Sequence, residues 1–231
     1  MKESTDLQTQ LEALEAQLKA VVDVEPSLAP FCQALCQVFN AERLSLFVVS
    51  PDGASIVSRV TTGLNLSQEM RLPISPQSLA GFVAFSKRPL NIPDAYNAAA
   101  LSAIHPELKF VESVDKATGF RSAQMMISPI VMGTEPNTLQ GVLQVINSKS
   151  GHAFSELELD GCIRISKSLS TALQKISPNG TIQTMATTNK PAPTAPATPA
   201  AAKPAPANAA PRAAGMPSKY DGLVNSGAVS K

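Results

Sequence analysis

The cysteines are the first residues of this chain whose type and spacing suggest chemistry. Cys32 and Cys36 are four residues apart, a spacing that places two thiols on one face of a helix, and Cys162 is the third cysteine. A zinc site would need further ligands, and neither a second cysteine pair nor a nearby histidine completes the set. An odd number of cysteines in 231 residues also argues against a disulfide scaffold. We therefore interpret all three as small buried apolar residues.

The histidines and paired carboxylates do not form a catalytic pattern either. His105 and His152 stand outside any triad or metal-ligand spacing, and their contexts indicate exposed positions. The glycines form no GxGxxG or GxxxxGK phosphate loop. Glu156 and Glu158 fall at the start of a predicted helix, where negative charge favours the helix dipole. The sequence therefore predicts a protein that is not an enzyme.

Two helices are predicted at the beginning of the chain. In residues 4–22, leucines recur with the 4-3-4 spacing of a single helix face. These residues are Leu7, Leu11, Leu14 and Leu18. The pattern leaves two alternatives open: an amphipathic helix that packs on its own domain, or a helix that joins two copies in a homodimer. Residues 26–40 predict a second helix, which has a proline in its first turn.

Alternating β-branched residues predict antiparallel strands after these helices. Residues 43–50 and 54–61 flank a Pro-Asp-Gly turn, and residues 123–132 and 139–147 predict a second hairpin. The other predicted elements are strands at 70–74 and 91–92 and helices at 77–86, 102–109 and 155–176. Ser155 and Glu158 form a capping box for the last helix. Contiguous hairpins with helices first and last indicate an α+β fold.

Three stretches of sequence resemble a known family. They read SLAGFVAFSKRPLNIPDAY (78–96), VDKATGFRSAQMMISPI (114–130) and GVLQVINSKSGHAF (141–154). In this order and spacing they resemble the GAF domains of cyclic-nucleotide phosphodiesterases, over about residues 24–176. The resemblance implies a GAF-like antiparallel sheet with flanking N- and C-terminal helices. It also implies a regulatory or sensory module that binds a small ligand or dimerises.

The resemblance assigns residues of this chain to a ligand pocket between the sheet and the helices on one side. In such a pocket, backbone N–H groups at a helix start meet a cyclic phosphate, and side chains on neighbouring strands face the nucleotide. The assigned positions are Ser45, Val60, Thr61, Ser78, Leu79, Ala80, Thr118, Ser122 and Gln144. Asp94 is also shared, and we interpret it as a helix cap.

Several positions depart from the family pattern. Val60 and Thr61 stand where the family has an aromatic residue and an acid that stack on and hydrogen-bond guanine. In the family's Asn-Lys…Phe-x-x-x-Asp-Glu signature, Ser148 replaces the lysine and Leu159 the last acid. The resemblance therefore implies a small ligand, with a cyclic nucleotide as the candidate cofactor. The alternative is a ligand-free dimerisation or docking scaffold.

The end of the chain differs in composition from the rest. Eight of the 19 prolines lie in residues 191–217, among Ala, Thr and Lys, and this composition predicts a disordered linker. Residues 218–231 weakly resemble the start of the N-terminal domain of type II secretion and type IV pilus assembly ATPases. The predicted organisation is an N-terminal helix (1–23), a GAF domain (24–178), a disordered Ala/Pro-rich linker (179–217), and the start of a further domain or a docking motif (218–231).

Composition also bears on partners and location. The hydrophobic fraction of 44% is enough for a core. Residues 190–231 carry five basic and one acidic residue, whereas the rest has 14 basic and 17 acidic. Such weak charge argues against nucleic-acid binding. No stretch approaches the ~20 apolar residues of a membrane span or a signal peptide's apolar run. We expect a cytoplasmic homodimer that relays ligand binding to a linked or partner domain, for which an ATPase domain in cis or in trans is the candidate.

Overall fold

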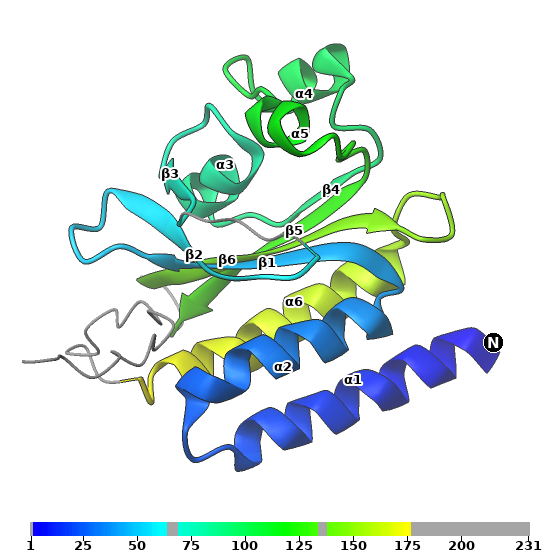
Figure 1. Cartoon of the computed structure of the whole chain (residues 1–231), viewed down its shortest axis with the longest axis vertical. Helices are drawn as coiled ribbons and strands as arrows, with labels where there is room; N and C mark the ends of the chain where they lie inside the picture. Colours follow the sequence, from blue (N-terminus) through cyan, green and yellow to red (C-terminus); the bar gives the residue numbers. More distant parts are fainter. Residues whose placement is uncertain (1, 64–68, 134–137, 177–231) are drawn as a thin grey trace, which may run out of the picture. The chain divides into compact units, whose positions relative to one another are not determined.

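The structure is a computed structural model that describes residues 2–63, 69–133 and 138–176. Its centre is a six-stranded sheet in which every pair is antiparallel, with the order β3-β2-β1-β6-β5-β4 (Figure 1). The strands are β1 (Ala41–Val49), β2 (Ser55–Thr61), β3 (Arg71–Pro73), β4 (Leu90–Ile92), β5 (Met125–Met132) and β6 (Thr138–Ser148). The predicted linker (179–217) and final segment (218–231) lie outside the described residues.

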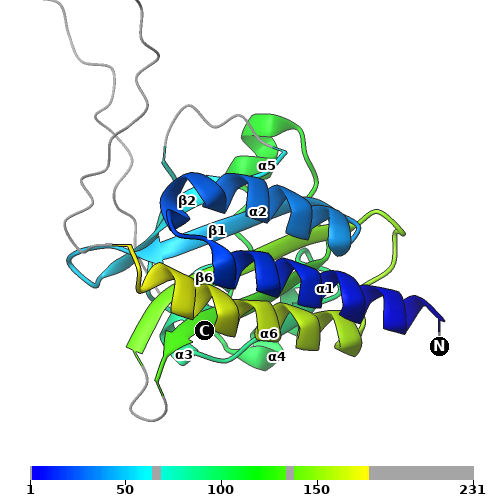
Figure 2. The same cartoon turned by 90° about the horizontal axis from the view of Figure 1, so that it is seen from below.

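Helices cover both faces of the sheet. One face carries α2 (Val24–Val38) and α6 (Glu156–Leu173), and α1 (Lys2–Ala20) packs against both on the side away from the sheet (Figures 1 and 2). The other face carries α3 (Leu79–Ser86), α4 (Ala98–Ile104) and α5 (Ser113–Thr118). The α+β prediction with flanking N- and C-terminal helices is confirmed. The predicted capping box is also present, since the Ser155 hydroxyl accepts from the Glu158 N–H and the Ser155 N–H donates to the Glu158 carboxylate.

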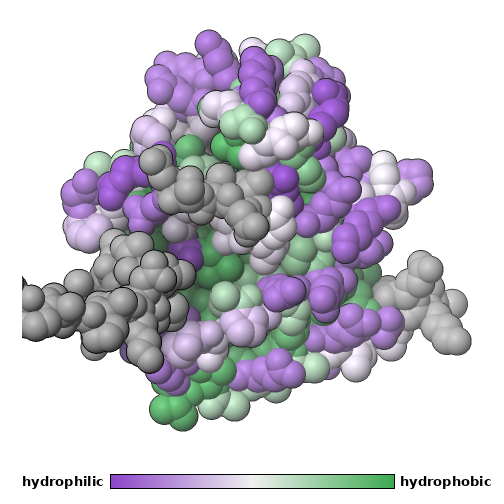
Figure 3. Space-filling view, viewed as in Figure 1, coloured by the Kyte–Doolittle hydropathy of each residue, from purple (hydrophilic) through white to green (hydrophobic). Residues whose placement is uncertain are grey.

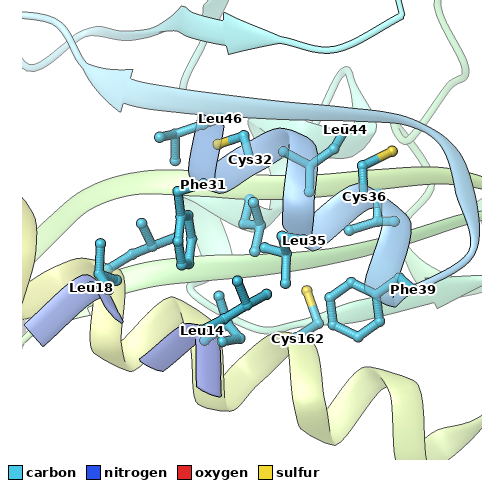
Figure 4. Packing of buried hydrophobic residues seen from close by; sticks show 14 of the residues in the cluster. Leu14, Leu18, Phe31, Cys32, Leu35, Cys36, Phe39, Leu44, Leu46 and Cys162 are labelled. Atoms are coloured by element: carbon cyan, nitrogen blue, oxygen red, sulfur yellow. The ribbon is translucent and has the colours of Figure 1, made fainter. Parts of the chain in front are cut away.

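The leucines of α1 are part of the core of their own domain. Leu11, Leu14 and Leu18 are 1%, 6% and 2% exposed, and they belong to the cluster in which α1 contacts α2 and α6. Figure 4 shows Leu14 and Leu18 in this cluster. Leu7 is half-buried against the same cluster. The side chains of this face are thus covered by α2 and α6, and a dimer through α1 stays a prediction. The alternative of a helix packed on its own domain is what the structure shows.

The cysteines lie in the same cluster, as predicted. Cys32, Cys36 and Cys162 are free thiols buried between α2, α6 and the sheet (Figure 4). The Cys36 thiol donates to the Ala41 carbonyl at 3.3 Å. Burial raises the pKa of Cys32 and of Cys162 from 9.0 to about 12. These side chains therefore act as neutral core residues.

The helix predicted at residues 102–109, between β4 and β5, has the wrong bounds. Helix α4 begins where the Asn97 side chain accepts from the Ala100 N–H, and it ends at Ile104 instead of continuing to residue 109. The reason is that Pro106 disfavours helical geometry in His105, which is extended. The short helix α5 was not predicted, because six residues show too little periodicity to reveal a helix.

Candidate ligand-binding site

A cavity of about 370 Å³ lies between the sheet and the helices on the α3–α5 face. Its floor consists of side chains from β1, β2, β5 and β6, and its walls come from β3, α3, α5 and the segment before α5. The volume falls at the small end of the range for small-molecule sites. This face of the sheet is therefore the place to look for a ligand.

One row of floor residues crosses three strands. Ser45 on β1 pairs in register with Thr61 on β2 and with Gln144 on β6, so the three polar side chains lie side by side on one face. Ser45 and Gln144 are buried. The Gln144 amide donates to the Met125 sulfur at 3.1 Å, a weak acceptor that orients the amide.

A second row lies beside the first and contains a buried cation. Arg43 pairs with Ile146 on β6, which pairs with Met125 on β5, and all three line the cavity. Arg43 is 8% exposed, and its guanidinium carbon lies 3.3 Å from the centre of the Phe120 ring. Burial lowers the pKa of the Arg43 guanidinium, whereas the negative charges of Asp115 and Glu42 act in the opposite direction.

The start of α3 forms one wall of the cavity. Ser78 caps the helix through its hydroxyl, which accepts from the Gly81 N–H at 3.2 Å, and Leu79 and Ala80 also line the cavity. A side chain at Gly81 would place its Cβ 2.5 Å from the Pro73 carbonyl oxygen. Glycine therefore lets the helix start approach β3 closely, which positions its first N–H groups at the cavity.

A buried carboxylate ties the α5 wall to the chain leading into β5. Asp115 is 6% exposed and accepts hydrogen bonds from the Ser122 N–H at 2.6 Å and the Ser122 hydroxyl at 2.7 Å. It also accepts from the Tyr96 hydroxyl at 2.7 Å. Both carboxylate oxygens are thus engaged by protein donors.

Seven of the nine predicted ligand-binding residues line this one cavity. They are Ser45, Thr61, Ser78, Leu79, Ala80, Ser122 and Gln144. Val60 does not, because successive strand residues face opposite sides and its side chain packs against the cluster beneath α2 and α6. Thr118 does not either: it is exposed at the end of α5, and its hydroxyl donates to the Val114 carbonyl. These two predicted positions therefore lie outside the lining of this cavity.

Sequence reasoning missed Arg43 and Asp115. Arg43 precedes Ser45 by two residues on the same strand, so strand alternation alone could have placed it on the cavity face. Asp115 offers no such signal, since its place depends on the unpredicted helix α5.

Two other predicted roles differ in detail. Asp94 accepts from the Tyr96 N–H in a turn, and the cap of α4 is Asn97 instead. Asn147, the first residue of the degraded family signature, has a φ of 53° and accepts from the Ala123 N–H at 2.8 Å. Its amide also donates to the Arg121 carbonyl and to Glu42. Asn147 therefore joins strand ends away from the cavity.

The described cysteines and histidines lie away from the cavity. The three cysteines belong to the opposite core, and neither His105 nor His152 lines the cavity. His105 packs against Phe82 at 5.6 Å between ring centres. Within residues 2–63, 69–133 and 138–176, no group of three or more His, Cys, Asp and Glu is arranged to hold a metal. No helix in these ranges has the length and apolar character of a membrane span.

A second cavity, of about 340 Å³, lies on the other face of the sheet. It is lined by the Glu25–Arg59 ion pair and by apolar residues of α2, β1, β2 and the end of α6. Hydrophobic residues gather where the sheet meets the helices below it (Figure 3). None of the predicted ligand-binding residues lines this cavity.

An antiparallel sheet with a small cavity beneath one layer of helices is typical of a ligand-binding domain. Comparison with known proteins identifies the family of this domain. The family model for the GAF domain matches residues 23–173. The chain belongs to the GAF domain family, whose members are regulatory and sensory modules.

Relatives by sequence include cyclic-nucleotide phosphodiesterases. The chain is 30% identical over 169 residues to the dual 3',5'-cyclic-AMP and -GMP phosphodiesterase 11 of Drosophila melanogaster, covering 64% of this chain and 11% of the relative. It is 27% identical over 157 residues to the bovine (Bos taurus) cone cGMP-specific phosphodiesterase subunit alpha', covering 63% and 17%. The chain thus spans less than a fifth of the length of these relatives.

Solved structures share the fold. The GAF domain of a phosphoenolpyruvate-protein phosphotransferase from Coxiella burnetii has a TM-score of 0.59 at 22% identity, covering 74% of this chain and 94% of that one. The free methionine-R-sulfoxide reductase of Neisseria meningitidis, solved with its substrate, has a TM-score of 0.57 at 15% identity, covering 74% and 90%. At these identities the likeness shows the fold alone, and the fold includes enzymes as well as regulatory domains.

Proposed function

We propose that this chain is a GAF-type regulatory module that binds a small ligand, a cyclic mononucleotide, in the cavity on the α3–α5 face. The observation that carries the proposal is the row of Thr61, Ser45 and Gln144 on adjoining strands, which meets the start of α3 across one cavity. Polar side chains on the floor and N–H groups at a helix start suit a ring system with an anionic end. The phosphodiesterase relatives support this ligand class.

The small cavity favours a cyclic mononucleotide over a cyclic dinucleotide. Val60 faces the opposite core and Thr61 is a small hydroxyl residue, so neither can stack on a base. Recognition of guanine by the mode of the family therefore has no counterpart at these positions. We expect weaker discrimination between adenine and guanine than such a stacked, hydrogen-bonded pair would provide.

The sheet offers a route from the cavity to the helices. Ser45 alternates on β1 with Leu44 and Leu46, which pack in the core beneath α2 and α6. In this proposal a ligand that binds one arrangement of these layers more tightly shifts the population toward it. The receiver is a linked or partner domain. That it is a secretion or pilus assembly ATPase is a prediction that rests only on residues 218–231.

Titration calorimetry of the 231-residue chain with cyclic AMP, cyclic GMP and cyclic di-GMP tests the ligand. We expect a dissociation constant on the order of tens of micromolar or below for at least one cyclic mononucleotide. Ser45→Leu, which fills the cavity, should abolish the heat, and Val60→Leu on the opposite face should retain it. No heat from any of the three compounds would remove the nucleotide version and favour a ligand-free scaffold.

A homodimer also remains a prediction. An interface formed by Leu11, Leu14 and Leu18 would require these side chains to leave the core in which α2 and α6 cover them. We expect a dimer to use the outer surface of these helices or another face. Light scattering of the full chain over a range of concentrations measures the oligomeric state directly.

A further inference from the structure

Arg43 is a buried cation that has no ion-pair partner among the described residues. It is 8% exposed, and its side chain forms neither a salt bridge nor a hydrogen bond with the part of the protein that the structure describes. Its one close partner is the ring of Phe120, at 3.3 Å. The residue as a whole is largely covered, but none of its guanidinium nitrogens is both shielded from solvent and unbonded, so its unpaired N–H donors stay open to water or to a ligand.

The nearby carboxylates are engaged elsewhere. Asp115 accepts from the Ser122 N–H, the Ser122 hydroxyl and the Tyr96 hydroxyl. Glu42 is exposed and accepts from the Asn147 amide at 2.8 Å. Both contribute long-range attraction to Arg43, but neither forms an ion pair with it. No described protein acceptor therefore takes up the guanidinium N–H donors, and Arg43 lines the cavity.

The stacking on Phe120 favours the same conclusion. A guanidinium that lies against an aromatic face keeps its N–H groups in its own plane, where they can form paired hydrogen bonds. Two acceptor oxygens in a fixed arrangement, as in a carboxylate or a phosphate, match this geometry. Arg43 lies in the floor row next to Ser45, and the start of α3 adds partial positive charge to the same cavity.

We propose that Arg43 is the specificity-determining residue of the cavity and binds an oxyanion, a carboxylate or a phosphate, of the ligand. This inference rests on the proposed ligand-binding function, and it narrows the ligand class to anions held from β1. A neutral ligand of the same shape would leave the cation uncompensated and should bind much more weakly.

The test follows the Arg43 Nε–H resonance by NMR in the full-length, ¹⁵N-labelled chain. Sodium phosphate and sodium acetate are the probes, and sodium chloride keeps the ionic strength constant. We expect a saturable shift with at least one probe, and the probe that saturates tells a phosphate from a carboxylate. A shift that stays linear, or that chloride reproduces, overturns the proposal.

Variants separate binding from folding. Arg43→Gln should weaken binding of the effective probe by about tenfold or more, since both charge and paired donors are lost. Arg43→Lys keeps the charge but not the paired donors, so it should weaken binding of the probe by about threefold, which is less than the loss expected for Arg43→Gln. This intermediate loss would show that affinity depends on the donors of this side chain and not on misfolding. Arg121→Gln is the matched control, because Arg121 also stacks on a ring, that of Tyr96 at 4.0 Å, but lies outside the cavity lining. If Arg43→Gln and Arg43→Lys bind within twofold of the parent chain, Arg43 has no such role.

Failure of the inference about Arg43 can be told apart from failure of the proposed cyclic-nucleotide binding. If a cyclic nucleotide binds and the Arg43 variants retain its affinity, the site is real and the inference about Arg43 is wrong. If no cyclic nucleotide binds but an oxyanion saturates at Arg43, the inference stands and the nucleotide is the wrong ligand. If neither the oxyanions nor the cyclic nucleotides shift the resonances of the Arg43 Nε–H or the Gln144 side-chain amide, both the inference about Arg43 and the proposed ligand-binding function are wrong.

Discussion

The Ser122 hydroxyl donates to the Asp115 carboxylate at 2.7 Å, while the Ser122 backbone N–H donates to the same group at 2.6 Å. This pair of hydrogen bonds fixes α5 to the segment that enters β5. Ser122 therefore lines the cavity with its donor already used, so it can offer a ligand only an acceptor. The resemblance assigned this hydroxyl to a position near a sugar and phosphate, and the structure shows that it also donates to Asp115.

Asp115→Asn should destabilise the domain. The neutral amide loses the charge-assisted character of hydrogen bonds from Ser122 and Tyr96, and its NH₂ group opposes one of these donors. We expect a loss of about 2–3 kcal/mol in the free energy of unfolding, measured by urea titration. The control is Asp94→Asn, which affects one exposed hydrogen bond to the Tyr96 N–H and should cost about 0.5 kcal/mol or less. Equal losses for the two variants would contradict the role of Asp115.

Leu11→Ala should destabilise the domain through its own core. Leu11 is 1% exposed and packs in the cluster shared by α1, α2 and α6, so truncation leaves a cavity costing about 2–4 kcal/mol. Leu157→Ala is the matched control: Leu157 is 36% exposed on α6 and should change stability by about 0.5 kcal/mol at most. Urea titration monitored by circular dichroism compares them. A Leu11→Ala variant as stable as the parent would return α1 to the role of an unpacked dimer helix.

Gly141→Ala should disrupt the pairing of β1 with β6. A Cβ at Gly141 would overlap the carbonyl oxygen of Phe47 on the neighbouring strand, and backbone cannot move aside as a flexible side chain can. We expect a loss of about 3 kcal/mol or an insoluble product. Gly151→Ala provides the comparison, since Gly151 has a φ of 78° and open space around it, so only the backbone cost of about 1 kcal/mol remains. Thermal unfolding of the two variants measures the difference. Equal midpoints would contradict the close contact of β1 and β6 at Gly141.

The buried thiols predict a loss of stability at alkaline pH. Burial raises the pKa of Cys32 and Cys162 from 9.0 to about 12, so the folded state keeps both protons while the unfolded chain loses them first. Their contribution is complete below pH 9 and declines as pH rises toward 12, by up to about 1.4 kcal/mol per pH unit for each thiol.

Denaturant titrations of the parent chain and of Cys162→Ala from pH 8 to pH 11 measure this slope. The variant should be less stable at pH 8 and should lose less with rising pH. A thiol reagent at pH 8 gives an independent readout, with slow labelling of the native protein and three reactive thiols in urea. Parallel slopes for both proteins would show that Cys162 is not kept protonated by burial.

Much of the fold could be predicted because it depends on local pattern. The two hairpins, the capping box of Ser155 and Glu158 and the amphipathic α1 follow from period, turn residues and caps. The region between β4 and β5 could not, since α4 and α5 are only seven and six residues long and carry weak periodicity. In a short helix, a single cap such as Asn97 decides where the element begins.

Part of the candidate site could likewise be predicted from the sequence, and part could not. The residue types of the floor and their strand alternation were available in the amino-acid sequence, which also carried the resemblance to the GAF family. That sequence alone could not decide whether the leucines of α1 face a second copy or their own domain, nor which of Val60 and Thr61 faces the cavity. Register and packing decide such questions, because they depend on contacts between residues far apart in the chain. Only the tertiary structure places Arg43 beside Phe120 and engages Asp115 elsewhere, leaving a buried cation at the cavity.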